Sequence, residues 1–286
     1  MKKTIKTIGL AVICSALTLT SGFAQSLKVP APSPTQKLTQ DFALSEIGIE
    51  YSRPGVKGRV VFGDLVPFGK IWRTGANAST KITFGEDVKV EGKAVKAGTY
   101  AIYTIPNKEA WEIMLYSDLK MGGNVSKYTT DNEVLRIKVN TKALTDMVET
   151  FTMNVADITA SSANIEFSWE KTKVAFNVTA DVDSVIMANI NETINTDNRP
   201  YYQAANYYYN NDKDLKKALE WVNKASEQNP KAFWVMLLKA RIEYKSKDYK
   251  AATMSAEKVI TMAKAAENTD YQKMAEELIA DAKKAK

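Results

Sequence analysis

The spacing of apolar residues changes near residue 184, and this change constrains the fold more than any other feature of the chain. Between residues 42 and 180 apolar and polar side chains alternate, as in Ile165-Glu166-Phe167-Ser168-Trp169. Such alternation buries one face of a β-strand and leaves the other in water. From residue 199 onward apolar residues recur at helical spacing instead. The chain is therefore predicted to be an α+β protein made of two modules, the first β-rich and the second all-α.

The first module, over residues 42–183, is predicted to be an antiparallel β-sandwich or jelly-roll-like domain. About nine short strands follow one another at the spacing typical of such domains. Turn-forming segments such as Glu91-Gly92-Lys93 separate them. A turn is also expected at Glu170-Lys171-Thr172-Lys173, which would make its two flanking segments a hairpin.

Residues 1–24 have the pattern of a secretory signal peptide. An apolar stretch follows three lysines, and small residues precede the expected cleavage site after Ala24. The apolar stretch is too short to cross a membrane, which takes about 20 residues. We therefore expect an exported protein, periplasmic or associated with the outer membrane or the cell surface, whose mature form has no transmembrane segment. The proline-rich residues 25–41 are predicted to be a linker.

The second module, over residues 199–286, contains an internal repeat and follows a connecting segment at 184–198. Lys213-Asp214-Leu215-Lys216-Lys217-Ala218 recurs as Lys247-Asp248-Tyr249-Lys250-Ala251-Ala252, an offset of 34 residues. In period and in residue pattern this stretch resembles tetratricopeptide repeats, which stack pairs of helices. The resemblance implies a helical module that binds a protein or peptide partner.

Aromatic residues of this helical module are candidates for contact with such a partner. Packing in the helical core is the alternative, because their spacing suits it equally well. The candidate partner-binding residues are Tyr202, Tyr209 and Trp234.

Two residue counts exclude much chemistry. The chain has no histidine, and its one cysteine, Cys14, lies in the predicted signal peptide. Serine or cysteine triads with histidine, histidine-ligated zinc and disulfides in the mature chain are therefore excluded. No Walker loop or dinucleotide-binding fingerprint occurs either. We expect no cofactor and no metal site, and we assign no catalytic residue.

The charge of the chain does not favour nucleic acid as a partner. The net charge of +6 includes three lysines of the predicted signal peptide and falls to +3 without them. Residues 25–198 hold 19 basic and 21 acidic side chains, whereas residues 199–286 hold 17 and 12. This difference is a second indication of two modules.

The densest group of unusual residues lies between Ser52 and Asn77. It combines several glycines with three arginines, whose planar guanidinium groups suit carboxylates and phosphates. In the alternative interpretation, the arginines pair with Asp64 or nearby acids and brace the sandwich. The candidate ligand-binding residues are Arg53, Arg59, Trp72, Arg73, Thr74 and Asn77.

This part of the chain resembles a bacterial envelope family called domain of unknown function 2911, over about residues 30–180. The resemblance implies an exported β-rich domain and no established activity. One departure is Met121-Gly122-Gly123-Asn124, where the family pattern would have a Trp-Gly pair. The resemblance rests on Tyr51-Ser52-Arg53-Pro54, Lys57-Gly58-Arg59, Phe62-Gly63, Leu65-Val66-Pro67, Trp72-Arg73-Thr74-Gly75-Ala76-Asn77, Ala97-Gly98-Thr99-Tyr100 and Ile105-Pro106.

We therefore expect a non-catalytic protein whose β module binds a polar or anionic small ligand and whose helical module binds a protein partner. The alternative is a hydrolase that acts on envelope glycan or peptide, because two carboxylates can carry out acid–base chemistry without histidine. Sequence spacing does not show that any two carboxylates converge. The candidates are Glu86, Asp87, Asp131, Glu133, Asp181 and Asp183.

Overall fold

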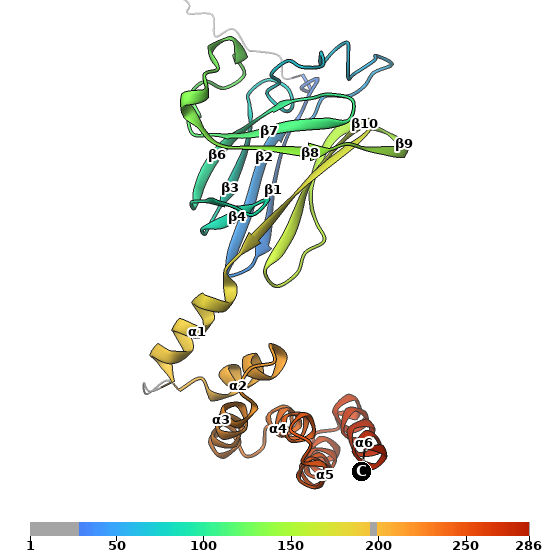
Figure 1. Cartoon of the computed structure of the whole chain (residues 1–286). Helices are drawn as coiled ribbons and strands as arrows, with labels where there is room; N and C mark the ends of the chain where they lie inside the picture. Colours follow the sequence, from blue (N-terminus) through green and yellow to red (C-terminus); the bar gives the residue numbers. More distant parts are fainter. Residues whose placement is uncertain (1–28, 195–198, 286) are drawn as a thin grey trace, which may run out of the picture.

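The computed structural model describes residues 29–194 and 199–285 and shows two modules (Figure 1). In these ranges ten β-strands come first and six α-helices follow. The α+β class in two modules is therefore confirmed. The predicted signal peptide lies outside the described residues, so its cleavage and the export of the protein stay predictions. Among the described helices none is both long and apolar enough to span a membrane.

The strands form two antiparallel sheets. The larger sheet has the order β1-β2-β3-β6-β7-β8, and the smaller one has the order β5-β4-β10-β9. The strands of the larger sheet are β1 (Thr35–Phe42), β2 (Ser45–Ser52), β3 (Thr80–Phe84), β6 (Gly98–Ile105), β7 (Ala110–Tyr116) and β8 (Glu133–Asn140). Those of the smaller sheet are β4 (Val88–Val90), β5 (Lys93–Val95), β9 (Lys142–Ala156) and β10 (Ser162–Ala180).

Most apolar residues of the two sheets meet in one core, because alternate side chains of each strand face inward. A separate cluster of β6 and β7 residues consists of Ala101, Tyr103, Met114 and Tyr116. Against the main core packs a cluster of five aromatic rings, with centroids of neighbouring rings 5.0–6.2 Å apart. Two of the rings come from the long loop between β2 and β3, and they anchor that loop to the core. The aromatic cluster consists of Phe62, Trp72, Trp111, Phe151 and Trp169.

The hairpin predicted around residues 170–173 is wrong, because β10 runs through this segment as one strand of 19 residues. Its pairing with β9 shifts register on both sides of Glu170, whose φ is +54°. An irregularity of this kind changes which residues face inward along the strand. Phe167 and Trp169 face the core before it, and Val174 and Phe176 face the core after it. Both apolar runs therefore belong to one strand.

Two predicted boundaries also change. The linker expected up to residue 41 already contains β1, which pairs with β2 over its whole length. Strand β1 is a sheet edge whose alternate residues are exposed, so the sequence pattern there is mostly polar. The connecting segment expected over 184–198 is largely α1 (Val182–Thr193), which begins at the capping carboxylate of Asp181.

Five helices follow α1, and the internal repeat of the sequence lies at the start of two of them. The repeated segments place Asp214 and Asp248 at the same position of two helices: each carboxylate accepts hydrogen bonds from the first turn of α3 or α5. The 34-residue offset therefore relates two structurally equivalent helix starts. The helices are α2 (Tyr201–Asn210), α3 (Leu215–Gln228), α4 (Phe233–Lys245), α5 (Tyr249–Ala265) and α6 (Thr269–Lys284).

One carboxyl group lies inside the packed helices. Glu243 of α4 is 5% exposed, its Oε2 has no hydrogen-bond partner in the described part of the chain, and the ammonium of Lys239 is 3.8 Å from Oε1. Burial raises the pKa of Glu243 above its usual value. Since the folded pKa exceeds the unfolded one, ionisation of Glu243 lowers the stability of the fold as the pH rises through these pKa values.

Glu243→Gln is therefore expected to stabilise the helical module by about 1 kcal/mol at neutral pH, because the amide fills the same space without a buried charge. Thermal unfolding followed by circular dichroism should show a higher melting temperature, and the gain should shrink in acid, where Glu243 is protonated. Glu227→Gln, at an exposed position of α3, is the control and should change nothing. A lower melting temperature of Glu243→Gln at neutral pH would contradict the interpretation.

Candidate functional site

A cavity of about 430 Å³ lies beside the long loop between β2 and β3. The structure brings four of the six predicted ligand-binding residues together around it, namely Arg59, Trp72, Arg73 and Asn77. Its volume is in the range of about 300–1,000 Å³ that small-molecule sites occupy. We call this space the loop cavity.

A tight turn positions Arg73 and Asn77. Arg73 Nη1 donates to the carbonyl oxygen of Asn77 at 2.9 Å, and Trp72 Nε1 donates to the carbonyl oxygen of Gly75 at 3.0 Å. Gly75 has a φ of +146°, and a Cβ there would lie 3.0 Å from the carbonyl oxygen of Ser52. The turn therefore needs glycine at this position. It leaves Nε and Nη2 of Arg73 without a partner among the described residues.

Arg59 braces its own loop through backbone carbonyls. Its Nε donates to Val56 at 3.0 Å and its Nη2 to Gly55 at 2.7 Å, which leaves Nη1 without a partner in the described part of the protein. The alternative prediction, that the arginines brace the sandwich, is thus partly observed: Arg59 braces its loop, but its partners are backbone carbonyl oxygens and not Asp64.

The loop cavity carries two positive charges that no acid balances. No Asp or Glu lines it. Within residues 29–194 and 199–285, no ion pair involves Arg59 or Arg73. Guanidinium groups with free N–H donors and no counter-charge attract carboxylates and phosphates. The cavity is therefore electrostatically suited to an anion.

The other two predicted ligand-binding residues do not line the loop cavity. Arg53 donates from Nε to the carbonyl oxygen of Phe151 at 3.1 Å and from Nη2 to Thr152 Oγ1 at 2.8 Å, which ties the loop to β9. Thr74 is fully buried, and its hydroxyl donates to Thr104 Oγ1 at 3.1 Å. Both side chains hold the loop in place.

Gly123 is a site residue that the sequence did not reveal. It lies in the loop between β7 and β8, directly against the turn that holds Arg73. A Cβ at Gly123 would overlap the carbonyl oxygen of Asn77 and lie 2.6 Å from Arg73 Nη1. Tyr103 fixes this loop by donating to the carbonyl oxygen of Gly122 at 2.6 Å. The only signal in the sequence was the Gly-Gly pair where the family pattern would have Trp-Gly.

The carboxylates considered for catalysis lie away from the loop cavity, and none of the six lines it. Asp87 pairs with Lys96 at 2.7 Å, and the hydrogen bond from Lys96 lowers the pKa of Asp87. Asp183 of α1 pairs with Lys213 at 2.8 Å and accepts a hydrogen bond from Tyr207 at 2.6 Å. Among the described residues no group of three or more acids or cysteines could hold a metal ion. The hydrolase alternative stays an untested prediction.

The predicted partner-binding residues lie in the helical module. Tyr202 and Tyr209 are half-buried and pack against the core of α1–α4. Lys245 lies over the ring of Tyr209 at 4.8 Å from its centroid. Trp234 is 39% exposed. The two tyrosines thus have packing roles, and the binding of a protein partner stays a prediction for all three residues.

Fold and site together define a β-sandwich protein with a cationic cavity beside the loop between β2 and β3, followed in the chain by a helical module. The chain belongs to the family of proteins of unknown function DUF2911, whose family model matches residues 33–178. The family resemblance predicted from the motifs is thereby confirmed, and the match includes every residue that lines the loop cavity. Comparison with curated proteins gave no match, and comparison with solved structures gave none.

Proposed function

We propose that the β module binds a small anionic ligand in the loop cavity without transforming it. The observation that carries this proposal is that Arg59 and Arg73 face one cavity in which no carboxylate balances them. Burying an anion against such donors strengthens each hydrogen bond, because both partners are charged or strongly polar.

The lining also indicates what else the ligand carries. Asn77 donates its amide hydrogens to the carbonyl oxygen of Ser33 at 3.2 Å and to Ser52 Oγ at 3.3 Å. Its Oδ1 accepts no hydrogen bond from the described residues, so it can accept one from a ligand hydroxyl. Leu65, Val66 and Trp72 supply apolar surface. A hydroxylated organic anion fits these groups better than a bare inorganic ion.

The ionisable groups of the loop cavity favour binding over catalysis. General acid–base catalysis needs a group that exchanges a proton near neutral pH. The charged residues lining the loop cavity are Arg59 and Arg73, and arginine stays protonated in proteins. They can hold and orient an anion, but they cannot take up a proton from it.

Arg73→Gln is expected to weaken binding of small hydroxylated anions by about 10–100-fold, as for the loss of a hydrogen bond between charged groups. The measurement is isothermal titration calorimetry of the full chain with galacturonate and with citrate. Affinity of the unmodified protein should also fall as salt is added.

Arg241→Gln, in α4 of the helical module, is the matched control and should leave the affinity unchanged. The melting temperature of each variant shows whether the fold is intact. Equal affinities of folded Arg73→Gln and the unmodified protein would rule out the proposed role of this cavity.

A further inference from the structure

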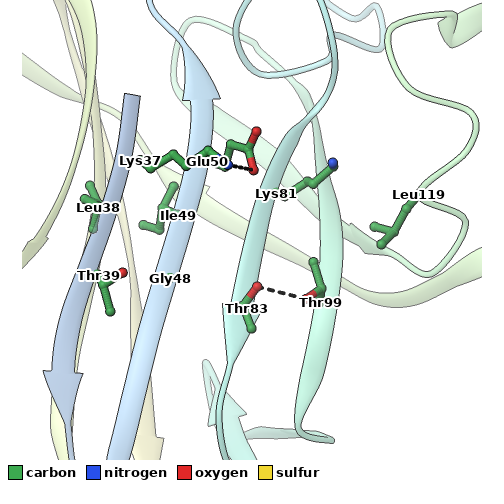
Figure 2. A pocket seen from close by; sticks show the side chains of 10 residues that line it. All are labelled: Lys37, Leu38, Thr39, Gly48, Ile49, Glu50, Lys81, Thr83, Thr99 and Leu119. Carbon is green, nitrogen blue, oxygen red and sulfur yellow. Dashed lines mark hydrogen bonds and ion pairs between the residues drawn. The ribbon is translucent and has the colours of Figure 1, made fainter. Parts of the chain in front are cut away.

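A second hollow, of about 370 Å³, lies on the outer face of the larger sheet, over β1, β2, β3 and β6 (Figure 2). Its floor is a row of residues that lie opposite one another on the four strands: Thr39, Gly48, Thr83 and Thr99. Gly48 has no side chain, which leaves the floor open. The hydroxyls of Thr83 and Thr99 are 2.9 Å apart. We call this hollow the sheet groove.

A row of charged residues lies beside this floor, with Lys37 opposite Glu50 and Glu50 opposite Lys81. Lys37 pairs with Glu50 at 3.2 Å. Figure 2 shows Lys81 on the neighbouring strand, outside that pair. Within the part of the chain that the structure describes, Lys81 has no ion-pair partner. The sheet groove therefore has one surplus positive charge.

Hydroxyl groups connect the sheet groove to the loop cavity. A small hollow of about 50 Å³ shares Glu50 and Lys81 with the groove, and its lining adds Thr35, Ser52 and Ser79. Ser52 in turn accepts the hydrogen bond from Asn77, which lines the loop cavity. Ser52 and Ser79 are buried, whereas Thr35 is exposed and lies between Ser33, which lines the loop cavity, and Lys37, which lines the sheet groove. The three hollows thus follow one another along this segment, with unbalanced cations at both ends.

We propose that the natural ligand is an acidic oligosaccharide, with one sugar acid in the loop cavity and the following units over the exposed Thr35 and along Lys81 in the sheet groove. This inference rests on the proposed anion binding and assigns the class of ligand. A chain of hydroxylated rings that bear carboxylates matches a surface of threonine hydroxyls with lysine and arginine at intervals.

An acidic peptide fits this surface less well. Extended peptides bind to sheets mainly through their backbone, and they need a strand whose own backbone groups are free. Strand β1 is the sheet edge, and its free backbone groups point away from the other strands of the groove. Strands β2, β3 and β6, which form the rest of the floor, are paired on both sides. Over β2, β3 and β6 the groove therefore offers side-chain hydroxyls and an ammonium group in place of backbone donors and acceptors.

The test compares ligands of increasing length in calorimetric titrations of the full chain. The probes are galacturonate, its trimer and its hexamer, with hexaglutamate as a peptide of equal charge. We expect the hexamer to bind at least about tenfold more tightly than the monomer, since linked units act as one multivalent ligand. Hexaglutamate should bind more weakly than the hexamer.

Variants separate the loop cavity from the sheet groove. Lys81→Gln should weaken hexamer binding several-fold and leave monomer binding unchanged, whereas Arg73→Gln should weaken both. Lys142→Gln, at an exposed position of β9, is the charge-matched control.

The inference would be overturned if the hexamer bound no more tightly than the monomer, or if Lys81→Gln left hexamer binding unchanged. Either result would leave the proposed function unaffected. Tighter binding of hexaglutamate would overturn the saccharide class. Failure of every probe, the monomer included, would overturn the proposed function together with this inference.

Discussion

Gly123→Ala is expected to lower the affinity of the loop cavity for small anions more than tenfold, while the β module stays folded. The added methyl group would overlap the carbonyl oxygen of Asn77, so this carbonyl, the Arg73 side chain or the loop between β7 and β8 has to move. Overpacking of this kind typically costs about 1–3 kcal/mol. Its first effect is on the hydrogen bond that orients Arg73. Titration with galacturonate measures the loss of affinity, and thermal unfolding measures the loss of stability.

A second glycine separates distortion of the site from loss of stability. Gly92, in the turn between β4 and β5, has a φ of +77°, and a Cβ there would meet nothing within 4 Å. Gly92→Ala therefore strains the backbone by about 1 kcal/mol or more without touching the loop cavity. It should lower the melting temperature and keep the affinity. If Gly123→Ala bound the anion as tightly as the Gly92→Ala control does, Gly123 would have no part in positioning Arg73.

Phe151→Ala is expected to destabilise the β module by about 3–5 kcal/mol, the usual cost of removing a buried aromatic side chain. Phe151 is fully buried, and its ring lies 5.3 Å from that of Trp72 and 5.7 Å from that of Trp169. It therefore supports both the core between the sheets and the loop that carries Arg73. Denaturant unfolding followed by tryptophan fluorescence measures the loss, because Trp72, Trp111 and Trp169 all belong to this cluster.

The control for this substitution is Phe233→Ala, at a half-buried position in the helical module that lies outside the β core. It should leave the unfolding transition of the β module where it is. A loss of less than 1 kcal/mol for Phe151→Ala would mean that the aromatic cluster is not a main support of the fold.

Local patterns along the chain were enough to predict the class of fold. Alternation over a few residues reports which face of a strand is buried, and the 34-residue offset reports equivalent helix starts at Asp214 and Asp248. The alternation of apolar and polar residues was misleading where a β-strand irregularity changed which residues face the core. The register shift at Glu170 moves the inward-facing side chains from odd-numbered to even-numbered residues. From the sequence alone, this change in spacing was interpreted as a turn.

The sequence predicted which segment carries the candidate site. It did not predict which side chains of that segment line the cavity. Arg53 and Arg59 lie in one loop, and residue type alone does not distinguish their roles. The contact of Arg53 with the carbonyl oxygen of Phe151 turns it into a brace, whereas Arg59 reaches the loop cavity. Phe151 lies far along the chain from both arginines, and only the packing of β9 under the loop brings it there.

The sequence by itself determined the two modules, the family, the lack of histidine and the loop segment that carries the cations, because each of these is a property of residue type or of short-range spacing. Tertiary structure decided which cations face a common cavity, that Gly123 lies against Arg73, and that Thr39, Gly48, Thr83 and Thr99 form one floor. The physical reason is that strand register and loop packing join segments far apart in the chain, and no short-range pattern records those contacts.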